Sequence, residues 1–112
     1  MHYLDISFTY KNTDISVREK LAFDSDDKKE QILKLINSNK NIKESMVLNT
    51  CNRVEIIASV EDVKAATAHI IRCMSIFSGV FEDELYERAD IYENTSNFMG
   101  SEYENLYAWF TS

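Results

Sequence analysis

A cysteine and an arginine stand two residues apart near the middle of the chain, in the segment NTCNRVEI, Asn49 to Ile56. A tight turn needs only residues that tolerate positive backbone angles, such as Asn, Asp or Gly, so turn formation does not explain Cys51 and Arg53. A guanidinium near a thiol favours the thiolate, and a position between two strands favours access to it. Cys51 is therefore a candidate nucleophile.

A structural role for the same two residues stays open. Reactive cysteines usually need a general base, and none is adjacent to Cys51 in sequence. In that interpretation Cys51 lies in a turn and Arg53 forms a surface ion pair. Cys73 falls within the apolar stripe of a predicted helix, where cysteine behaves as a small hydrophobic residue, so we expect it to be inert.

The remaining residues that could do chemistry do not predict a metal centre. The two cysteines lack CxxC spacing and have no accompanying histidine cluster, so neither a zinc site nor a disulfide framework is expected. His2 and His69 fall outside the Cys51 segment, and we expect surface or structural roles for them. Two free thiols and no metal are the prediction.

Strand patterns lie on both sides of the cysteine and near both ends of the chain. Leu4, Ile6 and Phe8 alternate with polar residues, which is typical of a strand with one buried face. Residues 46–48 and 54–59 predict two short strands that flank the Cys51 segment and pair as a hairpin. Residues 91–92 can form a brief fourth strand.

Helical patterns fill the segments between these strands. Thr13 or Asp14 can cap a short helix, and the stretch 24–41 predicts a long one with acids in its first turn. A second long helix is predicted over 61–78, ending before Gly79, and shorter helices over 81–89 and 100–112. The apolar stripes of the two long helices are formed by Ile32, Leu33, Leu35 and Ile36, and by Val63, Ala66, Ile70, Cys73, Met74 and Phe77.

The order of these elements predicts an α+β fold. Strand, helix, strand, strand, helix, strand matches the ferredoxin-like split β-α-β pattern, an antiparallel sheet with helices packed on one face, here followed by a C-terminal helix. A chain of 112 residues is a usual size for one domain, so we expect residues 1–112 to form a single domain.

The charge balance limits the partners. The chain has 19 acidic and 12 basic residues, a net charge of −7, whereas general nucleic-acid binders carry an excess of Lys and Arg. Acids concentrate after Phe81 and bases in the first half, so a polyanionic partner should approach the N-terminal half. No apolar run approaches the roughly 20 residues of a membrane span and no signal peptide precedes the first strand, so we expect a cytoplasmic protein without membrane contact.

Two segments resemble one enzyme family. The stretch VLNTCNRVEI is similar to the active-site segment of glutamyl-tRNA reductase, in which an apolar strand is followed by Thr-Cys-Asn-Arg, a variable residue, Glu and a second strand. Upstream, DISVREKLAF, Asp14 to Phe23, is similar to the segment that follows the first strand of that family. Both segments occur in the family's order and at close to its separation, and the resemblance covers nearly the whole chain.

The resemblance implies a two-step reduction of glutamyl-tRNA. A cysteine thiolate, here Cys51, attacks the glutamyl ester to form a thioester, and NADPH reduces it to glutamate-1-semialdehyde for tetrapyrrole (porphyrin) synthesis. Arg53 offers a forked donor for a carboxylate of the glutamyl group, and Thr50 and Asn52 offer hydrogen bonds that could orient the substrate. The chain would be the N-terminal catalytic domain of this oxidoreductase.

Departures from the family limit what this chain alone could do. It has two glycines, Gly79 and Gly100, and no GxGxxG motif, so the NADPH-binding and dimerisation domains are expected to be absent and a homodimer to exist only in the full-length enzyme. Asn105 stands where the family has a histidine. A non-catalytic ferredoxin-like domain that binds a ligand or protein, with Tyr103, Tyr107 and Trp109 as a partner surface, is the alternative.

Overall fold

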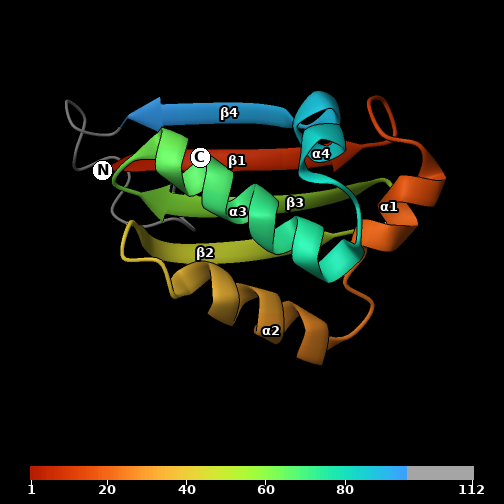
Figure 1. Cartoon of the computed structure of the whole chain (residues 1–112), viewed down its shortest axis with the longest axis horizontal. Coiled ribbons are helices and arrows are strands. Elements are labelled where there is room, and N and C mark those ends of the chain that lie inside the picture. Colours follow the sequence, from red (N-terminus) through yellow and green to blue (C-terminus); the bar gives the residue numbers. More distant parts are fainter. Residues whose placement is uncertain (96–112) are drawn as a thin grey trace.

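The computed structural model describes residues 1–95, which form a four-stranded sheet with helices packed against it (Figure 1). The predicted order of elements is confirmed over this part of the chain. The predicted helix over 100–112 lies outside the described residues, and so does Asn105, which stands where the family has a histidine. In chain order the elements are β1 (His2–Thr9), α1 (Ile15–Leu21), α2 (Asp26–Asn37), β2 (Ile42–Asn49), β3 (Arg53–Val60), α3 (Val63–Ser78), α4 (Glu82–Arg88) and β4 (Asp90–Thr95).

The sheet has the strand order β2-β3-β1-β4, and each neighbouring pair is antiparallel. Strands β1 and β2 are therefore parallel with β3 between them, and β3 and β4 are parallel with β1 between them. These are two interlaced split β-α-β units, so the predicted ferredoxin-like α+β fold is confirmed.

The two edge strands are longer than their apolar patterns predict. β2 begins at Ile42, opposite Val60, although Lys43 and Glu44 are exposed. β4 extends to Thr95, opposite His2, through the polar residues Glu93 and Asn94. An edge strand keeps its backbone pairing to one neighbour without needing apolar side chains on both faces, which is why the sequence underestimates both.

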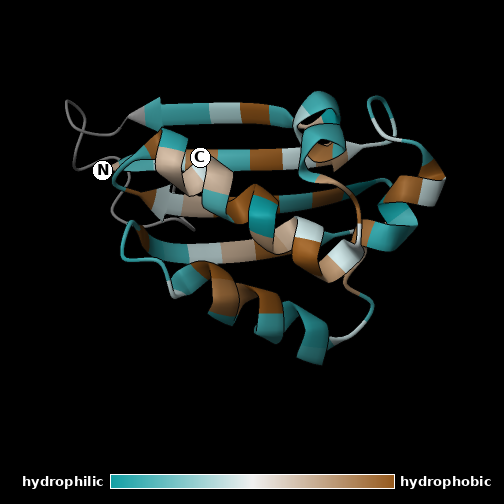
Figure 2. Cartoon of the chain, in the orientation of Figure 1, coloured by the Kyte–Doolittle hydropathy of each residue, from teal (hydrophilic) through white to brown (hydrophobic). Residues whose placement is uncertain are grey.

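One face of the sheet carries the hydrophobic core. Leu4, Ile6 and Phe8 of β1 are fully buried and pack with apolar residues of the helices. Hydrophobic and hydrophilic bands alternate along α2 and α3 (Figure 2), and the buried apolar residues of both helices, among them Ile36 and Ile70, belong to the core on this face. Ile32 and Ile36 are buried as predicted, whereas Phe77, at the end of the predicted stripe of α3, is 37% exposed.

The helix ends are set by local hydrogen bonds. The Ser25 hydroxyl accepts a bond from the Lys28 N–H at the start of α2, and the Asp62 carboxylate accepts one from the Ala65 N–H at the start of α3. At the end of α3, Gly79 has φ 76° and its N–H donates to the Ser75 carbonyl. Helix α3 therefore begins two residues later than predicted and ends where Gly79 predicts.

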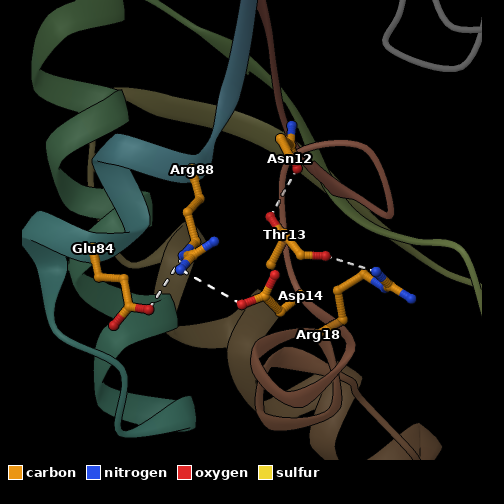
Figure 3. Close-up of polar contacts among 6 residues, drawn as sticks. All are labelled: Asn12, Thr13, Asp14, Arg18, Glu84 and Arg88. Atoms are coloured by element: carbon orange, nitrogen blue, oxygen red, sulfur yellow. Dashed lines mark hydrogen bonds and ion pairs between the residues drawn. The ribbon is translucent and has the colours of Figure 1, made fainter.

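A polar cluster ties the start of α1 to α4 (Figure 3). The Arg88 guanidinium lies 3.2 Å from Glu84 and 3.8 Å from Asp14, the residue that precedes α1. Nη1 of Arg18 donates to the Thr13 carbonyl at 2.7 Å, within the same turn. These contacts join the turn after β1 to α4, and α1 is thereby held near the end of the sheet where the Cys51 segment lies.

Replacement of Gly79 tests the left-handed end of α3. A Cβ at this position meets nothing within 4 Å, so Gly79→Ala should introduce backbone strain and no clash. We expect the free energy of unfolding to fall by about 1 kcal/mol, measured by urea denaturation. Gly79→Asn should lose less, because Asn tolerates this conformation better. Equal losses for both variants would contradict this explanation.

Candidate active site

The Cys51 segment is a short loop held by backbone hydrogen bonds on two sides. It joins β2 to β3, and the Thr50 N–H donates to the Arg53 carbonyl at 2.9 Å. The Asn52 N–H donates to the Thr50 hydroxyl at 3.3 Å, and the Asn52 carbonyl accepts the Tyr10 N–H at 3.0 Å. Among the described residues no amino acid other than glycine has a positive φ. The loop is therefore fixed without glycine.

Cys51 is exposed on this loop and faces α1. It lines a cavity of about 220 Å³ together with Thr50. The other lining residues come from α1, the residue after it and the start of β3: Ile15, Arg18, Glu19, Ala22 and Val54. The predicted nucleophile thus borders a small, mostly apolar cavity next to the second segment that resembles the reductase family.

A larger cavity of about 830 Å³ lies on the face of the sheet opposite the hydrophobic core. Arg53, Thr50 and Asn52 all line it, and Thr50 borders both cavities. The other lining residues are Asp5, Ser7, Thr9, Tyr10, Lys11, Leu48, Glu55, Asp90 and Tyr92. The predicted site residues therefore gather at one end of the sheet, with Cys51 and Arg53 on different cavities.

Arg53 is paired with an acid and not with the thiol. Its Nη1 atom lies 3.2 Å from Oε1 of Glu55, whose side chain is 6% exposed, whereas the Arg53 side chain is 50% exposed. A buried carboxylate needs such a partner, because removing an unpaired charge from water is costly. The sequence-based suggestion that Arg53 favours the Cys51 thiolate therefore finds no contact in the structure.

Behind Glu55 lies a second acid, Asp5. Burial raises the pKa of Asp5 to about 8, and a hydrogen bond and repulsion from Glu55 act in the same direction, while the charge of Arg53 opposes them. Oδ1 of Asp5 is buried and has no hydrogen-bond partner. Two carboxyl groups in one hydrogen bond require one shared proton. Asp5 is therefore neutral near pH 7.

Asp5 and Glu55 are the residues that the sequence-based site omits. Glu55 belongs to the family pattern without an implied role, and Asp5 is one of the polar residues that alternate with Leu4, Ile6 and Phe8. An acid inside the apolar run VEIIASV signals a buried charge that needs a partner. No comparable signal marks Asp5, because alternation places it on a face that could equally be solvated.

The other reactive side chains have structural surroundings. Cys73 is buried in the core, as predicted, and burial raises the pKa of its thiol. Nε2 of His69 lies 3.2 Å from the carbonyls of Leu35 and Ile36 at the end of α2, and 3.6 Å from Sγ of Cys73. His69 therefore connects α3 to the end of α2, and it is not near the Cys51 loop.

Within residues 1–95, no cluster of three or more His, Cys, Asp or Glu side chains could hold a metal ion. None of the helices in that part of the chain has the length and apolar character to cross a membrane.

The raised pKa of Asp5 predicts a pH-dependent stability. The unfolded chain loses this proton near 3.8, the ordinary value, whereas the folded chain holds it until about pH 8. Between these values the folded state binds more protons, so this group makes the free energy of unfolding fall as pH rises. Asp5→Asn removes that contribution, and the variant should gain stability over the unchanged chain from pH 4.5 to 8.

Urea denaturation at pH 4.5, 6 and 8 measures this difference. Asp90→Asn is the matched control, since Asp90 lines the same cavity but is exposed. Parallel pH profiles for the unchanged chain and Asp5→Asn would contradict the shared proton.

Comparisons with known proteins agree with the two segments in the sequence. The family model "Glutamyl-tRNAGlu reductase, N-terminal domain" matches residues 6–99. A glutamyl-tRNA reductase of Campylobacter concisus is 98% identical over 95 residues, 85% of this chain and 22% of that protein. The glutamyl-tRNA reductase of Campylobacter curvus is 73% identical over 95 residues, again 85% of this chain and 22% of that protein. The chain thus spans about a fifth of the length of these curated relatives.

A solved structure agrees in fold. Glutamyl-tRNA reductase from Methanopyrus kandleri matches with a TM-score of 0.52 over 82% of this chain and 19% of that chain, at 22% identity. The family model covers most of the chain, including both the α1 segment and the Cys51 loop. The chain belongs to the glutamyl-tRNA reductase family, of which it carries the N-terminal domain.

Proposed function

We propose that this chain is the N-terminal catalytic domain of an NADPH-dependent glutamyl-tRNA reductase and that Cys51 is its nucleophile. The supporting observation is the placement of Cys51: its exposed thiol stands on a glycine-free loop held by backbone bonds, beside a cavity. A thiol held in this way meets the geometric need of nucleophilic catalysis, which is a fixed approach to a carbonyl carbon. Glutamyl-tRNA is the proposed substrate, on the strength of the family.

The proposed step exchanges one ester for another. The Cys51 sulfur attacks the carbonyl carbon of the glutamyl ester, a C–S bond forms, and the bond from that carbon to the terminal ribose oxygen of the tRNA breaks. The thiol proton is transferred to the departing ribose oxygen, so the products are a thioester and uncharged tRNA. Thioester formation needs no metal, because the aminoacyl ester is already activated.

The larger cavity is the proposed place for the glutamyl side chain. Arg53 is half exposed there, and its contact with Glu55 uses one terminal nitrogen. The remaining N–H groups of the guanidinium fork can bind the γ-carboxylate of the substrate. Thr50 borders both cavities and Asn52 the larger one, so their side chains can orient the group between the thiol and the guanidinium.

The residues of this chain do not fit NADPH. Its two glycines, Gly79 and Gly100, are far apart in sequence and do not form a GxGxxG motif. In this proposal, the remainder of the full-length enzyme binds NADPH and carries out the reduction to glutamate-1-semialdehyde. Any homodimer likewise forms only in the full-length enzyme. Within residues 1–112, taken as a single domain, we assign acyl transfer only.

The nucleophile can be tested by the mass of the chain after mixing with glutamyl-tRNA. The unchanged chain should gain one glutamyl group on Cys51. Cys51→Ser should gain none, because a serine hydroxyl is a far weaker nucleophile of nearly the same size. Cys73→Ser is the matched control and should still be glutamylated. An adduct on the Cys51→Ser chain would refute the assignment and favour a binding domain without catalysis.

Arg53→Lys tests the carboxylate contact. The ammonium keeps the charge but lacks the planar fork, so the rate of glutamyl transfer at low tRNA concentration should fall at least about tenfold. Arg72→Lys is the control, since Arg72 pairs with Glu82 on the helical side of the fold. An unchanged rate for Arg53→Lys would mean that Arg53 serves only to neutralise Glu55.

A further inference from the structure

The floor of the larger cavity holds an acid that belongs to neither family segment. Asp5 lies on β1, where it is paired with Ile57 of β3 and Tyr92 of β4. Two residues further along β1, Ser7 is paired with Glu55. Side chains two residues apart on a strand share a face, so Asp5 and Glu55 are diagonal neighbours on the face of the sheet opposite the main hydrophobic core.

The two acids have different partners. Oε1 of Glu55 lies 3.2 Å from Nη1 of Arg53. Asp5 forms no ion pair with any residue in 1–95, and its hydrogen bond is to Glu55 itself. Burial raises the pKa of Asp5 to about 8, so at pH 7 Asp5 carries the proton of this bond and donates it to Glu55.

Other charges face the pair from every neighbouring element. Arg53 approaches from β3, and Asp90 and Tyr92 approach from β4. On β1 itself, burial and the charge of Glu44 on β2 raise the pKa of Tyr3 above its ordinary value of 10. Lys11 and Tyr10 come from the turn after β1. Burial raises the pKa of Asp5 to about 8, so this carboxyl group changes its charge between pH 7 and 9.

We propose that Asp5 is a positioning residue for the carboxylate site: by sharing its proton with Glu55 it holds Glu55 against Arg53 and leaves a single negative charge behind the guanidinium. This proposal rests on the proposed function, in which Arg53 binds the glutamyl carboxylate. Loss of the proton places a second negative charge behind Arg53, which repels an incoming carboxylate and draws the guanidinium towards the floor of the cavity. The site therefore binds anions better when Asp5 is neutral.

Glutarate is a suitable probe, because it has the carbon chain of the glutamyl group and both its carboxylates stay ionised from pH 6.5 to 9.5. Its binding to the chain can be followed by NMR through the Arg53 side-chain Nε–H, and through backbone amides where that proton exchanges fast. The affinity of the unchanged chain should fall about three- to tenfold between pH 7 and 9. In Asp5→Asn, whose amide donates to Glu55 at every pH, it should stay constant.

Asp90→Asn is the matched control and should keep the pH dependence, whatever its effect on affinity. If both the unchanged chain and Asp5→Asn bind glutarate with the same pH dependence of affinity, the role of Asp5 is overturned. The carboxylate site at Arg53 would still stand. Absence of glutarate binding at any pH would instead overturn the carboxylate site at Arg53, and the role of Asp5 with it.

A second measurement needs no variant. The carboxyl carbon of Asp5 in the isotopically labelled unchanged chain should titrate near pH 8, far above an ordinary aspartate. Titration of both Asp5 and Glu55 below pH 5 would show that no proton is shared, and would overturn the proposal independently of any ligand.

Discussion

A buried carboxylate on a central strand is the constraint around which the face of the sheet opposite the main hydrophobic core is arranged. Glu55 lies on β3, between β1 and β2, with almost no exposure. Burial of an acid there is tolerable only if its oxygens find partners. Arg53 supplies one partner from the same strand, two residues earlier, and Asp5 of β1, whose pKa burial raises to about 8, supplies the other through a hydrogen bond. The cavity is polar because these three groups must meet.

The interlaced topology brings this arrangement close to Cys51, the proposed nucleophile. The loop after β2 and the turn after β1 lie at the same end of the sheet, because β1 pairs antiparallel with β3 in a register that sets Thr9 opposite Arg53. The hydrogen bond between the Tyr10 N–H and the Asn52 carbonyl joins the two. The cluster of Arg88, Asp14 and Glu84 then holds α1 beside the loop. Local turns and long-range pairing therefore act together on Cys51.

The sequence predicts the parts of this fold that depend on periodic burial. The alternation of Leu4, Ile6 and Phe8 and the stripe ending near Gly79 are sufficient for β1 and α3, because a buried face imposes its period on the residues that form it. The lengths of the edge strands β2 and β4 cannot be predicted from apolar periodicity, because residues such as Lys43 and Glu93 contribute only backbone pairing. Cys51 and Arg53 could be recognised as a motif. Their assignment to separate cavities, and the role of Asp5, depend on which face each residue occupies in the assembled sheet.

Thr50 separates the two cavities as a shared wall, and the loop that carries it is short, free of glycine and bonded at both ends. Backbone motion of a loop held in this way does not carry the Cys51 thiol from one cavity to the other. In the proposed reaction, reorientation of an acyl carbonyl on Cys51 must come from rotation about the bonds of the acyl group and of the cysteine side chain. The acyl group would then rotate while the loop stays in place. The position of the loop would determine which face of the carbonyl a later reactant can approach.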